Sequence, residues 1–229
     1  MRYASSIERP VSYEIRDALL DARKRVGSDF AYWPSYKLIV LIYSLDDFRT
    51  LRSEKPEWVA GEFDGKIRVP FPEGQTDLRA MKIVLFHEYA HALVQDLAKG
   101  KCPTWFNEGL AEYEGRRNGV GILMSLAQAE ATNTLIPWSR MNDQFSMGLS
   151  SDQVRLGYEQ SYSIVRYLAE RYGFWRIRRA LKSIGDGVPL ETALPQEFHI
   201  KVSRLEEAWR KWLPQMLSTA AADPTAIRE

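Results

Sequence analysis

The sequence predicts an α+β fold in which a small half with a mixed sheet precedes a mostly helical half. Strand signals occur in two early places, the run YKLIVLIYS at 36–44 and an alternating segment at 66–71. After residue 100 the chain instead shows helical periodicity, interrupted by Gly, Pro and Asn. No internal repeat or low-complexity segment interrupts this order.

These signals also predict how the chain is organised. Its 229 residues can bury a substantial core, and we expect a single domain with two lobes. One lobe, about 30–100, would hold the sheet and a long histidine-containing helix. The other, about 101–217, would be helical, and 218–229 would form a loose tail. Two lobes that face one another make a cleft, where functional sites tend to lie.

Several local patterns define the elements of the first half. Apolar residues at helical spacing predict a helix over 11–26, with Gly27 as its stop. Ser44 is a good cap for a short helix that follows the first strand. The Asp64–Gly65 pair predicts a turn before the second strand. Pro70 and Pro72 place that strand at the edge of the sheet, because proline cannot donate to the ladder.

Helices account for the remainder of the chain. A long one should begin at Thr76 and Asp77 and continue to Lys99, where Gly100 ends it. A short helix among turns is expected between 185 and 200. The other expected helices lie at 103–116, 120–131, 151–172, 174–184 and 202–217.

Composition excludes some classes of function. The 31 basic and 30 acidic side chains give a net charge of +1, so no basic excess is available to bind nucleic acid. The longest clean apolar run, Leu38 to Tyr43, is too short to span a membrane, and the N-terminus lacks the apolar core of a signal peptide. We therefore expect a soluble chain, cytoplasmic by default. Compartment and oligomeric state are not readable from the sequence.

The stretch HEYAH holds two of the three histidines and predicts a metal site. Residues four apart lie on one face of a helix, so His87 and His91 can direct two imidazoles at one ion. Zinc accepts neutral imidazole nitrogen. Glu88 lies about 100° round the helix, beside the metal, where it could take a proton from a water. The apolar surroundings strengthen this interpretation, because buried imidazoles and carboxylates need partners.

A catalytic zinc site needs a third protein ligand, and the next helix offers Glu108. Gly109 would let another helix or the substrate approach closely. Glu112, one turn further on, could accept a hydrogen bond from a ligand histidine and fix its tautomer. We interpret Glu114 as an exposed carboxylate.

HEYAH followed by WFNEGLAEY resembles the gluzincin metallopeptidases, the clan of thermolysin and the zinc aminopeptidases, and most closely the bacterial peptidase MA-like domains. The resemblance covers about 36–213. It implies a two-lobed, thermolysin-like fold. It also implies that His87, His91 and Glu108 bind one Zn²⁺ ion and that Glu88 is the general base.

A second match lies in GYEQSYSIVRYL, which resembles the YEKG segment of the zinc aminopeptidases. There a tyrosine hydroxyl contacts the oxyanion, and the matching position is Tyr158, with Tyr162 as a rival one turn away. The G-x-M-E-N segment that holds a free amino group in those enzymes is missing. An endopeptidase is therefore favoured over an aminopeptidase. The segment GEFDGKIRVPF, 61–71, resembles the strand that lines the cleft above the metal in this clan, where an extended peptide could pair.

The predicted function is hydrolysis of peptide bonds in a peptide or protein substrate by a metal-activated water and a Glu general base. The alternative is a catalytically inactive binding module that retains the fold and possibly zinc. A structural zinc site is usually closed by a fourth protein ligand, for which Cys102 or His199 could serve. A helical protein whose histidines are accidental is a further alternative.

Overall fold

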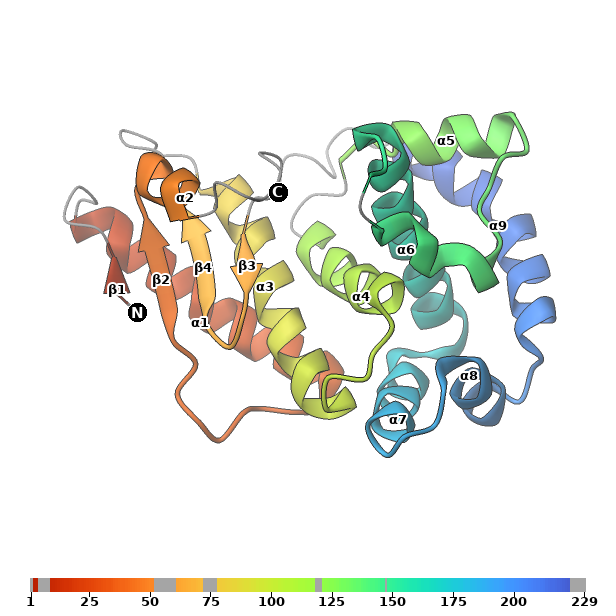
Figure 1. The fold of residues 1–229 in the computed structure, drawn as a ribbon, viewed down its shortest axis with the longest axis horizontal. Coiled ribbons are helices and arrows are strands. Elements are labelled where there is room, and N and C mark those ends of the chain that lie inside the picture. Colours follow the sequence, from red (N-terminus) through yellow and green to blue (C-terminus); the bar gives the residue numbers. More distant parts are fainter. Residues whose placement is uncertain are drawn as a thin grey trace. The chain divides into compact units, whose positions relative to one another are not determined.

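The computed structural model describes residues 2–3, 9–51, 61–71, 78–117, 121–146 and 148–222. The chain divides into two compact units, Met1–Leu93 and Val94–Glu229. The boundary falls inside helix α3 (Arg79–Ala98), so this helix contributes residues to both units. Figure 1 shows the elements of each unit.

The first unit contains a small mixed sheet with the strand order β1-β2-β4-β3. Strand β2 (Val40–Tyr43) pairs in parallel with both β1 (Arg2–Tyr3) and β4 (Ile67–Pro70). Strand β3 (Glu62–Phe63) closes an antiparallel hairpin with β4. The predicted α+β class, with a small mixed sheet before a helical remainder, is confirmed.

The predicted edge position of the second strand is wrong, because β4 lies between β2 and β3. The backbone N–H groups of Ile67 and Phe71 donate to carbonyls on the β2 side, so Pro70 faces the opposite side. The described β3 pairing ends at Glu62, which lies opposite Arg68. Pro70 therefore lies beyond this pairing, where its missing N–H breaks no bond of the described ladder.

Helix α1 (Arg9–Phe30) runs across one face of the sheet (Figure 1) and buries a continuous apolar stripe. It does not stop at Gly27 as expected. A Cβ at this position would lie 2.2 Å from Trp33 Nε1, so the glycine makes room for the tryptophan and the helix continues through it. The guanidinium of Arg25 lies 5.2 Å from the ring centre of Phe86, which links α1 to α3.

Two helix ends behave as the sequence predicts. The short helix α2 (Leu45–Leu51) is capped by Ser44, whose hydroxyl accepts the N–H of Asp47 at 3.1 Å. Helix α3 ends at Ala98, before Gly100, which adopts a φ of 72°. Helix α3 begins at Arg79, and its expected start at Thr76 and Asp77 lies outside the described residues.

The second unit is built around α6 (Ser151–Tyr172), which contacts most of the other helices of this unit (Figure 1). All residues from Glu159 to Ala169 except Arg166 are buried, which shows how completely this helix is enclosed. The other helices of this unit are α4 (Thr104–Arg116), α5 (Met124–Ala131), the 3-10 helix η1 (Trp138–Phe145), α7 (Phe174–Gly185), α8 (Leu190–Phe198) and α9 (Val202–Ala222).

Close packing of α4 on α6 depends on Gly109. A Cβ at Gly109 would lie 2.6 Å from the backbone oxygen of Ser161, so the two helices meet backbone to backbone. The expected close approach at Gly109 is therefore made by another helix. It fixes the helix that carries Glu108 and Glu112 against the centre of the unit.

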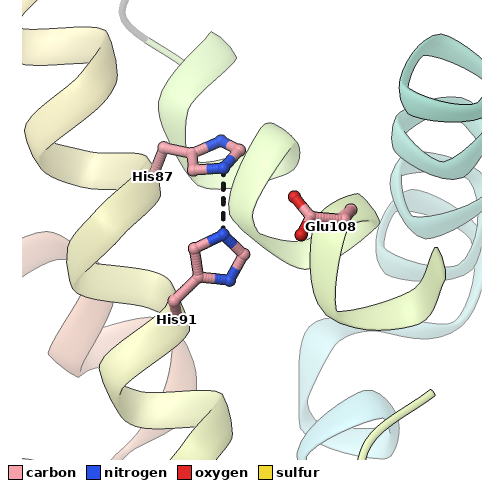
Figure 2. A group of neighbouring side chains, drawn as sticks. All are labelled: His87, His91 and Glu108. Carbon is pink, nitrogen blue, oxygen red and sulfur yellow. Dashed lines mark hydrogen bonds between the residues drawn. The ribbon is translucent and has the colours of Figure 1, made fainter. Parts of the chain in front are cut away.

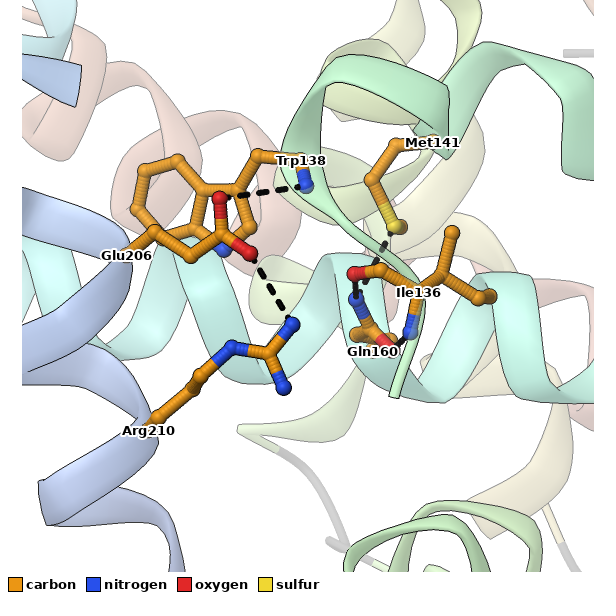
Figure 3. A network of polar contacts seen from close by, with 6 residues as sticks. All are labelled: Ile136, Trp138, Met141, Gln160, Glu206 and Arg210. Carbon is orange, nitrogen blue, oxygen red and sulfur yellow. Dashed lines mark hydrogen bonds and ion pairs between the residues drawn. The ribbon is translucent and has the colours of Figure 1, made fainter. Parts of the chain in front are cut away.

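A polar network fixes the segment between α5 and η1 (Figure 3). The buried amide of Gln160 accepts the N–H of Ile136 at 3.0 Å and donates to its carbonyl at 2.6 Å. Nearby, Glu206 accepts the backbone N–H of Trp138 at 3.4 Å and pairs with Arg210 at 2.9 Å. Satisfying these groups in the interior rigidifies the unit.

The chain end differs from the prediction. Helix α9 continues to Ala222, so 218–222 are helical rather than part of a loose tail, and 223–229 lie outside the described residues. Among the described helices, none combines the length and the apolar character needed to span a membrane.

Candidate metal centre

Helix α3 presents two imidazoles on one face. His87 and His91 are one turn apart, both are half-buried, and their Nε2 atoms are separated by 3.0 Å. Their rings meet edge to face, with centres 4.7 Å apart and an interplanar angle of 83°. The pair therefore directs two nitrogen atoms at a common point, as the spacing predicts.

A carboxylate from the following helix completes a group of three. His87, His91 and Glu108 each offer one ligand atom, and these atoms all lie within 4.8 Å of one another. Figure 2 shows the two histidines on α3 and the glutamate on α4. Only 99–103 separate the two helices in the chain, so the group is drawn from successive elements.

The geometry fits a single metal ion. Two nitrogens bound to one tetrahedral zinc, each at about 2.0–2.1 Å, lie roughly 3.3 Å apart, close to the observed 3.0 Å. A hydrogen bond between the two imidazoles would give a similar spacing, but it does not require a carboxylate beside them. Two nitrogens and one oxygen form a donor set that zinc accepts and that leaves a coordination position open.

Glu88 lies outside this group, as its position on the helix predicts. Glu88 is 4 % exposed. It follows His87 directly in the chain, so it lies about 100° away from His87 around the helix. The backbone of Gly61, just before β3, passes close to the Glu88 carboxylate. Gly61 belongs to the segment expected to line the cleft, but its contact with Glu88 was not predicted, because no local pattern links it to a residue 27 positions later.

Glu112 is partly buried and paired. Its Oε2 accepts a hydrogen bond from Arg116 Nε at 2.5 Å, and both side chains are less than one-fifth exposed. The one-turn spacing between the two residues could have identified Arg116 from the sequence. A contact of Glu112 with a histidine remains a prediction.

The expectation that Glu114 is an exposed carboxylate is wrong. Its side chain is fully buried, on the same side of α4 as Leu110 and Ala111. Arg117 Nη1 lies 3.4 Å from Glu114 Oε2, so the guanidinium supplies a positive charge beside the buried acid.

The two candidate tyrosines differ in their surroundings. Tyr158 is half-buried, and its ring meets that of Phe145 edge to face with centres 5.2 Å apart. Tyr162 is 3 % exposed, and its hydroxyl accepts a hydrogen bond from Arg166 Nη1 at 3.3 Å. Burial raises the pKa of Tyr162. Tyr158 is thus the more accessible of the two residues.

The chain was also compared with known proteins. The family model described as the Peptidase MA superfamily matches residues 73–215, more than half of the chain. The chain belongs to the Peptidase MA superfamily. A search of the curated proteins and a search of the solved structures each found no match.

Membership of the Peptidase MA superfamily agrees with the donor group, because this superfamily is typically metal-dependent. The matched residues include all three donors as well as Glu88 and Tyr158. The two side chains considered as a closing fourth ligand, Cys102 and His199, are not members of the group found among the described residues. The superfamily match and the geometry therefore both point to one site.

Proposed function

We propose that this Peptidase MA protein is a zinc-dependent peptidase that hydrolyses peptide bonds with Glu88 as general base. The observation that supports the proposal most directly is the group of His87, His91 and Glu108, with ligand atoms within 4.8 Å of one another. Two imidazoles and one carboxylate with an open fourth position form a donor set that catalytic zinc sites use. Bound there, it would lower the pKa of a water to about 7 and polarise a carbonyl oxygen.

The residues of the chain have separate tasks in this mechanism. Glu88 takes a proton from the attacking water and returns it to the leaving amine. Its location on α3, next to His87 in the chain but directed elsewhere, suits a base that does not itself bind metal. The burial of its carboxylate limits competition from bulk water.

Tyr158 would stabilise the oxyanion that forms on the scissile carbonyl. A phenol can donate one hydrogen bond to such an oxyanion. The half-buried position of Tyr158, compared with the enclosed Tyr162, supports this assignment. Resemblance to the gluzincins without a G-x-M-E-N segment favours endopeptidase over aminopeptidase action.

An inactive binding module is the second candidate. It would retain the fold and, as a structural zinc site, would usually have four protein ligands. The metal-ligating group of the described residues has three members, and a glutamate suited to act as base lies beside it. These two features favour the enzyme.

The decisive experiment is digestion of a broad peptide library by wild-type protein, with and without a chelator, and by Glu88→Gln. Glu88→Gln should retain zinc but lose hydrolysis, because the amide cannot accept the proton. Glu191→Gln, an exposed change on α8, should cleave as wild type does. Wild-type rates in Glu88→Gln would exclude the proposed base, and zinc-loaded wild type without hydrolysis would favour the binding module.

A further inference from the structure

Gly61 lies against Glu88, the proposed general base, but does not belong to the helix that carries Glu88. Gly61 is buried and stands immediately before β3, whereas Glu88 belongs to α3. Its backbone φ lies outside the positive range that side chains avoid, so conformational freedom does not explain the glycine. The space around its Cα must explain it instead.

That space is already filled by α3. A Cβ at Gly61 would lie 2.7 Å from Glu88 Oε1 and 3.0 Å from Glu88 Cγ. It would also lie 2.7 Å from Val84 Cγ1, one turn earlier on the same helix. Contacts this short do not occur between real side chains, so any residue other than glycine must displace Glu88, Val84 or the backbone.

The backbone at Gly61 cannot withdraw easily. The next two residues, Glu62 and Phe63, pair with Arg68 and Ile67 of the central strand β4. Ile67 is completely buried, which anchors the hairpin to the core of the first unit. The Glu88 carboxylate is also enclosed, at 4 % exposure, so it has little room to turn toward solvent.

We infer that Gly61 is a positioning residue that holds the Glu88 carboxylate in its working place by contact with the bare backbone. The inference rests on the proposed function, because it assigns Glu88 the role of base. The backbone that contacts the Glu88 carboxylate leads into strand β3 and is not part of the helix that carries the glutamate. The position of the base therefore depends on two elements of the first unit and not on the rotamer of Glu88 alone.

Gly61→Ala tests this role. The added methyl group should push the carboxylate aside, and a displacement of about 1 Å can cost roughly 100-fold in rate. We expect kcat to fall about 10–100-fold with little change in KM, while zinc content stays at the wild-type level. Crystal structures of wild type and Gly61→Ala should show a displaced Glu88 carboxylate.

A double-mutant cycle with Glu88→Asp separates positioning from general loss of packing. Aspartate is one methylene shorter, so its carboxyl carbon takes the place of Glu88 Cγ, and the 2.7 Å clash of the added Cβ with Glu88 Oε1 is removed. Gly61→Ala should then reduce kcat much less in the Glu88→Asp background than in wild type, which is a strong coupling between the two sites. If Gly61→Ala folds poorly, Gly61→Ala combined with Val84→Ala relieves the second clash and is compared with Val84→Ala alone.

The control is Gly187→Ala in the turn between α7 and α8. Gly187 has a φ of 97°, and an added Cβ would lie 3.9 Å from Lys101 Nζ, an ordinary contact, so alanine there strains the backbone without touching Glu88. It should lower stability and leave kcat unchanged. Wild-type kcat in Gly61→Ala, or equal losses in both backgrounds of the cycle, would overturn the positioning role while hydrolysis by wild type upheld the function. Failure of wild type to cleave any peptide would instead refute the proposed function, and this inference with it.

Discussion

At the scale of single residues, Arg116 interacts with several side chains of the helical unit. Its Nε binds Glu112, and its guanidinium lies 5.2 Å from the ring centre of Tyr162. Its charge also acts on the buried Glu159. The hydrogen bond from Arg116 orients the Glu112 carboxylate, whose contact with a histidine remains a prediction.

Glu108 and Glu112 of α4 should therefore affect metal binding to different degrees. Glu108→Ala removes a proposed ligand and should abolish stoichiometric zinc binding. Glu112→Gln keeps the side-chain shape but removes a charge, and should weaken zinc affinity by about 10–100-fold. Elemental analysis and a competition titration with a chromophoric chelator measure both. Equal zinc affinity in Glu108→Ala and wild type would contradict the assigned donor group.

At the scale of elements, Glu159 of α6 supports the start of α5. Its Oε2 accepts the backbone N–H of Leu126 at 2.8 Å, one of the first N–H groups of α5 that lack a partner within the helix. The carboxylate is 3 % exposed, and burial raises the pKa of Glu159 above its ordinary value despite this hydrogen bond. Relative to its protonated form, the charged Glu159 carboxylate is thus less favourable in the folded protein than in the unfolded chain.

A pH-dependent loss of stability follows. Above the ordinary carboxyl pKa the unfolded chain releases the proton while the folded protein still retains it, so the Glu159 contribution to stability falls as pH rises through the raised folded pKa. Glu159→Gln keeps an oxygen for Leu126 and has no charge to bury. Relative to wild type, it should gain stability as the pH rises above about 4.5 in urea unfolding. A stability difference that does not change with pH would show that Glu159 carries no such penalty.

The elements also show what a sequence can predict. Gly100 ended a helix as expected, because nothing but the local chain determines that turn. Gly27 did not end one, because its bare Cα serves a contact with Trp33 six residues away. Pro70 suggested an edge strand, yet only the partial length of the β3 pairing makes its central position acceptable. Local sequence signals were reliable where the local backbone determines the structure, and they failed where tertiary contacts determine it.

In the candidate site, too, the residues set by local geometry could be predicted and those set by tertiary contacts could not. One-turn spacing on a helix brings His87 and His91 together without help from the rest of the fold. Glu108 was predicted from its residue type and its position in the next helix, and the structure places it with them. Glu114 and Gly61 could not be interpreted correctly, because the burial of one and the neighbours of the other depend on packing between distant segments.

At the scale of the whole molecule, zinc binding should be coupled to folding. The donor atoms come from two helices, and the unfolded chain does not hold them in place, so the ion binds the folded state preferentially. Free zinc at 1,000 times its Kd would then add about 4 kcal/mol to the free energy of unfolding. Removing the metal with a chelator should lower the Tm, and restoring zinc should recover it.

Variants distinguish this coupling from unspecific effects of metal on the protein. Glu88→Gln keeps all three donors and should show the same zinc-dependent rise in Tm as wild type, although it hydrolyses nothing. Glu108→Ala should unfold at one temperature with or without zinc. Acidification should reproduce the effect of the chelator in wild type, because protonated imidazoles cannot bind the ion. A Tm of wild type that does not respond to zinc or to its removal would contradict the metal centre itself, since an ion held by two helices of the folded protein must stabilise it by mass action.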